Sequence, residues 1–317
     1  MPADILTVTL NPTLDVSTTV TKLIDHAKLR CTPEREQVGG GGINVAHVIH
    51  SLGASCQAML TVGGLRGQDI VQRLTNSGLD CVQAPIAEQA RQCFTVYESQ
   101  TKHEYRFVLP GPRLSNQEQV TCTAVILQHL PTKYLVLSGS LPPGVPDDYY
   151  ATVIRSARQR NPSLRMVVDA SGQALDAALD AGVFLCKPSR EEFCALTGED
   201  FTSPVDIDRC VDAARELIKQ GKTEIVALTL GADGSLIVTL DQAWRIEPLA
   251  VRVTSTVGAG DSFIGGFVWS MTRQEDIIQA VRLGTAAAAA ALQTQGALLF
   301  DGQAIVATSK QAVAAPI

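Results

Sequence analysis

Asp261 follows a short glycine-containing loop, Gly258, Ala259 and Gly260, in the stretch STVGAGDSFIGGF, and an apolar run typical of a helix comes after it. Glycine lets a backbone approach a ligand closely, and the first N–H groups of a helix attract anions. Aspartate is also a favoured helix N-cap, because its carboxylate can accept one of those N–H groups. The residue types therefore predict one of two roles for Asp261, a catalytic group beside a bound anion or a cap.

Three glycine-rich stretches indicate phosphate chemistry: GGGGINVAHVI at 39–49, TLGADGS at 229–235 and VGAGDS at 257–262. None has the spacing of a P-loop. None has the dinucleotide spacing G-x-G-x-x-G either, because Asn44 and Phe263 stand where the third glycine would be. Two of the stretches lead into helical patterns, which favours anion binding by backbone N–H groups.

The charge balance limits the partners. The chain has 317 residues, a formal net charge of -6 and a pI near 5.4, which argues against a general affinity for nucleic acid or anionic membranes. An anionic ligand must therefore meet a local basic patch. No apolar run approaches the roughly 20 residues of a membrane span and the first residues lack a leader pattern, so we expect no membrane partner and a cytoplasmic location.

The eight cysteines are scattered without a C-x-x-C pair. This spacing excludes a zinc ribbon and a thioredoxin motif. We expect packed, reduced thiols.

The elements that must position these residues read as an α/β fold. Apolar runs suited to buried strands alternate with helical patterns, which predicts a mostly parallel sheet with helices on both faces. The predicted strands are 5–10, 134–139, 165–170, 183–188 and 224–230; the predicted helices are 44–52, 147–160, 174–181, 205–220, 261–272 and 275–292. Two further short strands are expected at 235–240 and 243–247.

Segments 12–38 and 91–109 differ in composition from the apolar strands of the main sheet, because they are strand-prone but polar. Segment 91–109 has the pattern of a hairpin around the turn SQTKH. We expect them to form a small projecting sheet. Its strand EYRFVL would place Tyr105, Phe107 and Leu109 on one face and Arg106 on the other. An apolar face of that kind predicts packing against a second subunit, a homodimer.

Taken in order, these motifs carry a family resemblance over essentially the whole chain. The chain resembles the phosphosugar branch of the PfkB, or ribokinase-like, carbohydrate kinases. The two stretches that carry the resemblance most clearly are GGGGINVA and STVGAGDSFIGGF, and further matching stretches are NPTLD, YRFVLPGP, SGSLPPGV, DASGQAL and KPSREEF. The resemblance implies a single ribokinase-like domain over 1–317, a three-layer αβα fold whose small projecting sheet is a lid that covers the substrate and forms a dimer.

The implied activity is ATP-dependent transfer of the γ-phosphoryl group to a ketohexose phosphate, with Asp261 as the base. The backbone N–H groups of Val257 to Asp261, which include Gly258, Ala259 and Gly260, would form an anion hole. Relatives that use fructose 1-phosphate carry Gly-Lys-Gly where this chain has Gly40, Gly41 and Gly42. This difference favours fructose 6-phosphate, converted to fructose 1,6-bisphosphate. Tagatose 6-phosphate, fructose 1-phosphate and a non-catalytic sugar-phosphate sensor remain open alternatives.

The resemblance also implies the binding residues, although each charged one, taken alone, would pass for a solvated surface charge. For the sugar and its phosphate they are Asp15, Lys28, Arg30, Gly40, Gly41, Gly42, Asn44, Arg91, Arg106, Gly139 and Ser140. For ATP they are Lys187, Ser189, Thr229, Gly231, Ala232, Asp233 and Gly234, with Ser189 where the family often has Asn.

Two ions complete the expected site. Glu192 would organise Mg²⁺ through water, because that ion gives up its water reluctantly. A monovalent cation such as K⁺ would be held by backbone carbonyls around Ser255, Val257, Ala291, Thr294 and Gly296.

Overall fold

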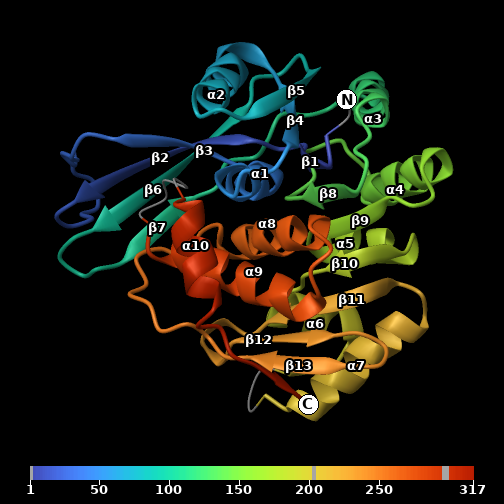
Figure 1. Ribbon diagram of the computed structural model, residues 1–317. Coiled ribbons are helices and arrows are strands. Elements are labelled where there is room, and N and C mark those ends of the chain that lie inside the picture. Colours follow the sequence, from blue (N-terminus) through green and yellow to red (C-terminus); the bar gives the residue numbers. More distant parts are fainter. Residues whose placement is uncertain (1–2, 202–204, 295–299) are drawn as a thin grey trace.

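The structure is a computed structural model that describes residues 3–201, 205–294 and 300–317. A ten-stranded sheet forms its centre, and a four-stranded sheet projects from one side (Figure 1). Helices cover both faces of the large sheet, so the αβα architecture predicted from the sequence is confirmed.

The large sheet is mostly parallel. In spatial order its strands are β14 (Ala314–Pro316), β13 (Ala243–Ile246), β12 (Ser235–Val238), β11 (Thr223–Thr229), β10 (Val183–Cys186), β9 (Arg165–Asp169), β8 (Tyr134–Ser138), β1 (Ile5–Thr9), β4 (Cys56–Val62) and β5 (Asp80–Pro85). The strands from β11 to β5 are parallel, and β12 to β14 are added antiparallel at one edge. The central strands are nearly continuous apolar runs because both of their faces are covered.

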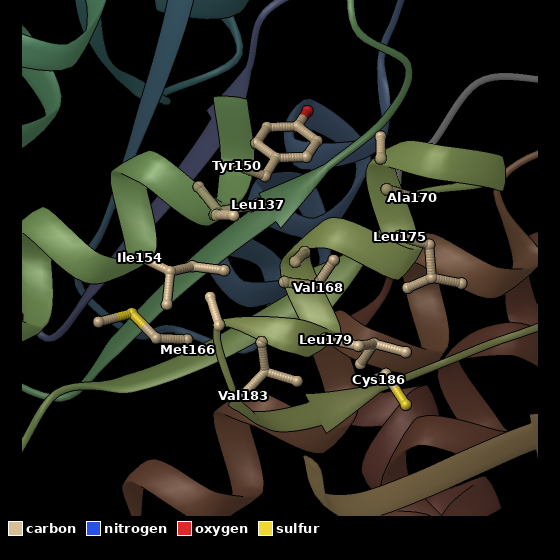
Figure 2. Close-up of a cluster of buried hydrophobic side chains, with 14 of the residues drawn as sticks. Leu137, Tyr150, Ile154, Met166, Val168, Ala170, Leu175, Leu179, Val183 and Cys186 are labelled. Carbon is tan, nitrogen blue, oxygen red and sulfur yellow. The ribbon is translucent and has the colours of Figure 1, made fainter. Parts of the chain in front are cut away.

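Each face of this sheet has its own helices. On one face lie α1 (Gly41–Ser51), α2 (Gly64–Asn76), α8 (Ala259–Thr272), α9 (Ile277–Leu292) and α10 (Gly302–Ser309). On the other lie α3 (Asn116–Gln128), α4 (Tyr149–Arg160), α5 (Gly172–Asp180), α6 (Arg190–Thr197) and α7 (Ile207–Lys219). Figure 2 shows part of the second layer, a buried cluster that contains Tyr150 and Ile154 of α4, Leu179 of α5, Val168 of β9 and Val183 of β10.

Side chains of the central strands alternate between the two cores. On β1, Ile5 packs with α1 and α8, whereas Leu6 and Val8 pack with the opposite layer. This alternation follows from the two-residue period of a strand.

The projecting sheet, hereafter the lid, has the order β3 (Arg35–Gly39), β2 (Thr13–Val20), β6 (Arg91–Glu98) and β7 (Glu104–Phe107). The predicted hairpin is confirmed as β6 and β7, and β2 runs parallel to β6. One prediction is wrong: β7 ends at Phe107, so Leu109 lies beyond the strand and shares no strand face with Tyr105.

Several elements had no sequence prediction. Residues 53–90 contain β4, α2 and β5, and residues 110–133 contain α3. Helix α1 also begins at Gly41 rather than near 44, because the glycines that were read as a loop already have helical backbone. Of the helices described, none combines the length and apolar character needed to cross a bilayer.

The cysteines follow the expectation with one exception. All eight are described as free thiols, and burial raises the pKa of Cys81 and Cys210 to about 11. Cys31 is exposed, so the expectation of packing was wrong there, because it lies in the irregular segment between β2 and β3.

Candidate active site

The carboxyl ends of β8, β9 and β10 meet the first turns of α1 and α8 at one edge of the large sheet. Parallel strands end at a common edge, which is where ligands bind in open α/β sheets. Asp261 lies in the first turn of α8, and Asn44 in the first turn of α1. Residues 217 positions apart in the sequence are thereby brought into contact.

The Asp261 carboxylate is held by side chains outside its own helix. Asn44 Nδ2 donates to Asp261 Oδ2 at 2.8 Å, and Ser138 Oγ donates to Oδ1 at 3.4 Å. The N-cap position of α8 is Gly258, with φ 75° and no side-chain cap. Asp261 is therefore not the cap of α8, and the first N–H groups of this helix have no side-chain acceptor at the cap position, as an anion site requires.

Gly41 makes room for this arrangement. A Cβ atom on Gly41 would lie 2.2 Å from Ser138 Oγ and 3.0 Å from Asp261 Oδ1. Gly139 links the next strand: it has φ 104°, its N–H donates to Asp169 O at 2.9 Å, and its carbonyl accepts from Tyr150 Oη at 3.0 Å. Both glycines permit close backbone approach.

Lys187 lies at the centre of this edge rather than on a helix surface. Its side chain is 8% exposed, and its Nζ lies 3.3 Å from Asp169 Oδ1. A Cβ on Gly260 would lie 2.8 Å from that Nζ, so the ammonium group sits against the start of α8. Burial alone would lower the Lys187 pKa, but the Asp169 and Asp261 carboxylates outweigh it and raise that pKa.

A cavity of about 180 Å³ lies between the lid and the first turn of α1. Its lining includes Asp15 and Cys93 from facing positions of β2 and β6, together with Arg91, Arg106, Asn44 and Gly258. Burial raises the pKa of Asp15, although the charges of Arg106 and Arg91 oppose that rise. Gly39 leaves room for the Asp15 carboxylate, since a Cβ at position 39 would lie 2.2 Å from Asp15 Oδ2.

Not every predicted sugar residue lines this cavity. Lys28 and Arg30 are exposed in the segment between β2 and β3, and neither is among its described lining residues. Ser140 is exposed and accepts from Asn11 Nδ2 at 3.1 Å. Gly40 lines the cavity, whereas Gly42 packs on the backbone of β1.

The predicted ATP residues fall on two loops that touch. Ser189 and Thr229 form a β-bridge, and Thr229 N donates to Pro188 O at 3.0 Å. The second loop continues through Gly231, Ala232 and Asp233, one 3₁₀ turn, to Gly234 at φ 89°. Arg190 bonds the Asp233 carboxylate and fixes the loop to α6.

Glu192 has a structural role at the start of α6. Its Oε2 accepts from Ser189 N at 2.8 Å, while Ser189 Oγ accepts from Glu192 N at 3.2 Å. This reciprocal pair is a capping box, and it explains why serine is acceptable at position 189. Among the described residues no three His, Cys, Asp or Glu side chains form a metal cluster.

The predicted monovalent-cation residues come together in part. Thr254 N and Ser255 N both donate to Leu292 O, at 2.7 and 3.2 Å, which joins the loop before α8 to the end of α9. Ala291 O already accepts from Thr294 N and Oγ1. Gly296 lies outside the described residues.

Sequence reasoning missed Ser138, Asp169 and Asn11. Each sits at or just beyond the carboxyl end of a buried strand, within the quoted motifs SGSLPPG, DASG and NPTLD. Their position after an apolar run was the available signal.

Comparison with known proteins places the chain in a family. A family model described as pfkB family carbohydrate kinase matches residues 11–301. ATP-dependent 6-phosphofructokinase isozyme 2 of Mycobacterium tuberculosis is 39% identical over 294 residues, 92% of this chain and 85% of that protein.

Two solved structures of phosphofructokinase-2 from Escherichia coli share the fold. The complex with potassium has a TM-score of 0.90 and 34% identity and covers 98% of this chain and 99% of that one. The complex with fructose-6-phosphate has a TM-score of 0.87 and 34% identity, and the match covers 97% of this chain and 99% of that one. The chain with its Asp261 loop, glycine-rich α1 start and lid belongs to the pfkB family of carbohydrate kinases.

Proposed function

We propose that this kinase transfers the γ-phosphoryl group of ATP to the 1-hydroxyl of fructose 6-phosphate, giving fructose 1,6-bisphosphate and ADP. The proposal depends on one observation, a cavity with basic side chains that is connected to the Asp261 carboxylate. Arg91 and Arg106 line one cavity with Asp15, and Asn44 joins that cavity to Asp261. Two guanidinium groups suit a phosphate dianion in an otherwise acidic chain.

In this proposal Asp261 is the base. The sugar hydroxyl attacks the γ-phosphorus, the bond to the leaving ADP oxygen breaks, and Asp261 accepts the hydroxyl proton. Asn44 and Ser138 hold the two carboxylate oxygens, so the base is oriented before the substrate arrives. Asp15 has the acceptor oxygens to fix a second sugar hydroxyl.

The charge that spreads over the phosphoryl oxygens would be met by two groups. The first N–H groups of α8 lie behind the Gly258 cap, and the Lys187 ammonium lies beside Gly260. The loop of Thr229 to Gly234, next to Ser189, would hold the rest of ATP.

Mg²⁺ would lie near Glu192, which contributes to the charge felt by Lys187. Bound there through water, the ion would neutralise part of the phosphate charge. K⁺ would lie between Ser255 and the end of α9. Two observations support this: hydrogen bonds join the loop before α8 to the end of α9, and the Escherichia coli protein has been solved in complex with potassium. Turnover in tetramethylammonium buffer, with and without added KCl, tests the K⁺ proposal.

The substrate is tested by coupled ADP release across a panel of fructose 6-phosphate, tagatose 6-phosphate, fructose 1-phosphate, fructose and ribose. We expect the highest kcat/KM with fructose 6-phosphate. A higher value for another phosphosugar would reassign the substrate, and no turnover of any sugar, with sugar-phosphate binding retained, would make the chain a sensor.

We also propose that the exposed apolar side chains of β6 and β7 form a homodimer interface at the edge of the cavity, which Phe94 and Phe107 also line. Phe94 pairs with Phe107 across β6 and β7, and these side chains are 39% and 51% exposed in the single chain. Tyr105, two residues before Phe107 on β7, is 37% exposed, and Leu109, which lies beyond the strand, is 44% exposed. An exposed apolar cluster of this kind is typical of a protein–protein contact.

Phe107→Asp should break the dimer and raise the KM for the phosphosugar, because Phe107 lines the cavity together with Arg106. Val120→Asp, a 61% exposed position on α3, is the matched control and should change neither property. Sedimentation of both variants decides the matter: a monomeric parent protein, or an undissociated Phe107→Asp variant, would exclude this interface.

A further inference from the structure

Asp169 is a largely buried acid at the last position of β9, next to the last position of β10 in the sheet. Cys186 pairs with Val168 in the register of β10 and β9, so the following residue, Lys187, comes opposite Asp169. The ion pair of 3.3 Å between them is 8% exposed on the lysine and 16% on the aspartate.

The place that this ion pair fixes is unusual for a cation. Lys187 Nζ lies against Gly260, in the first turn of α8, where the helix end carries partial positive charge. That end repels an ammonium group and attracts an anion. The carboxylates of Asp169 and Asp261 flank the ammonium group and offset this repulsion.

We propose that Asp169 is a positioning residue for phosphoryl transfer, which holds the Lys187 ammonium beside the anion hole of α8 before the phosphoryl group arrives. The inference rests on the proposed kinase reaction and on the expected contact of Lys187 with the phosphates. Without Asp169, the carboxylates of Asp261 and Glu192 still act on the flexible lysine side chain, Asp261 the more strongly, so the lysine can pair with the base itself. Asp169 thus keeps Lys187 ordered and leaves the Asp261 carboxylate free for the hydroxyl proton.

The charge state of Asp169 should matter for the same reason. Burial raises the pKa of Asp169 to about 6, and the nearby Asp261 carboxylate adds to the rise while Lys187 opposes it. The other titratable groups that face Asp169 are Tyr150 from α4 and Cys186 of β10, and burial raises the pKa of both. Below about pH 6, Asp169 becomes protonated and releases the lysine.

The test uses Asp169→Asn and Asp169→Glu in the full chain, with Asp180→Asn as control, a surface position whose side chain is 62% exposed. We expect kcat with fructose 6-phosphate to fall about tenfold or more in Asp169→Asn, the size of one hydrogen bond to a charged group, while KM for the sugar stays within about twofold. Asp169→Glu keeps the charge and should retain more activity. At saturating sugar, kcat of the parent protein should fall below pH 6, and this limb should be absent from Asp169→Asn.

A second readout does not need turnover. Cyanate modifies the neutral form of a lysine, so its reaction with Lys187, followed by mass spectrometry, should be faster in Asp169→Asn than in the parent protein. Unchanged kcat and unchanged modification of Lys187 in Asp169→Asn, or an Asp169→Glu variant no better than Asp169→Asn, would overturn the inference. A parent protein that turns over no sugar would instead refute the proposed function, while cyanate would still report how Lys187 is held.

Discussion

Replacing the Asp261 carboxylate with an amide of the same shape separates its chemical role from its structural one. The carboxylate accepts from Asn44 at 2.8 Å and from Ser138 at 3.4 Å. In Asp261→Asn the amide oxygen can still face Asn44, and the new NH₂ group can donate to Ser138 Oγ. We therefore expect the free energy of unfolding to change by no more than the net value of one hydrogen bond, about 0.5–1.5 kcal/mol.

Catalysis should change far more. A positioned base contributes about 10²–10⁴ to the rate, so kcat should fall by that factor, which corresponds to about 2.7–5.4 kcal/mol on the barrier. The substitution also removes one of the three carboxylates, Asp169, Asp261 and Glu192, that raise the Lys187 pKa. It removes as well the Asp261 charge that helps to raise the Asp169 pKa. Both pKa values should therefore move down.

The assay is coupled ADP release with fructose 6-phosphate and ATP, with ATP binding and thermal unfolding measured on the same preparations. Asp276→Asn is the matched control, because Asp276 is a true N-cap whose side chain accepts from Gln279 N at 2.8 Å. It should leave kcat unchanged. A folded Asp261→Asn protein with kcat within about threefold of the parent would refute the assignment of Asp261 as base.

Three further outcomes follow from the geometry. Arg91→Ala should raise the KM for the phosphosugar about 10- to 100-fold and leave the KM for ATP unchanged, since one charge-assisted contact is worth about 1.5–3 kcal/mol; an equal rise for ATP would place Arg91 elsewhere. Gly41→Ala should lower kcat at least about tenfold in a folded protein, because its Cβ would lie 3.0 Å from Asp261 Oδ1. Burial lowers the pKa of His47 to about 4, so between pH 6.5 and 4 the unfolded chain binds a proton that the folded chain does not. The free energy of unfolding should therefore fall with falling pH, by up to about 3 kcal/mol. Urea unfolding should show a smaller fall for His47→Gln than for the parent protein.

The glycine-rich loops and the central strands could be predicted from the local sequence. The Gly258 to Asp261 stretch, the glycines before Asn44 and the apolar runs of the parallel strands were legible because each depends on neighbouring residues only. The hairpin at 91–109 was legible for the same reason, and only its end at Phe107 was misjudged. In contrast, β4, α2, β5 and α3 were not predicted, although α3 begins with a capping box of Ser115 and Glu118 that was a local signal.

Other features could not be read from neighbouring residues. The choice between cap and base for Asp261 depends on Asn44 and Ser138, which come from other elements. The pairing of Lys187 with Asp169 depends on the register of β10 against β9, and the exposed position of Lys28 and Arg30 depends on how the lid leaves the main sheet. Residue types and short spacings thus determined which chemistry is available, whereas the alignment of strand ends at one sheet edge decided which side chains act together, because contacts between distant residues exist only after the sheet has formed.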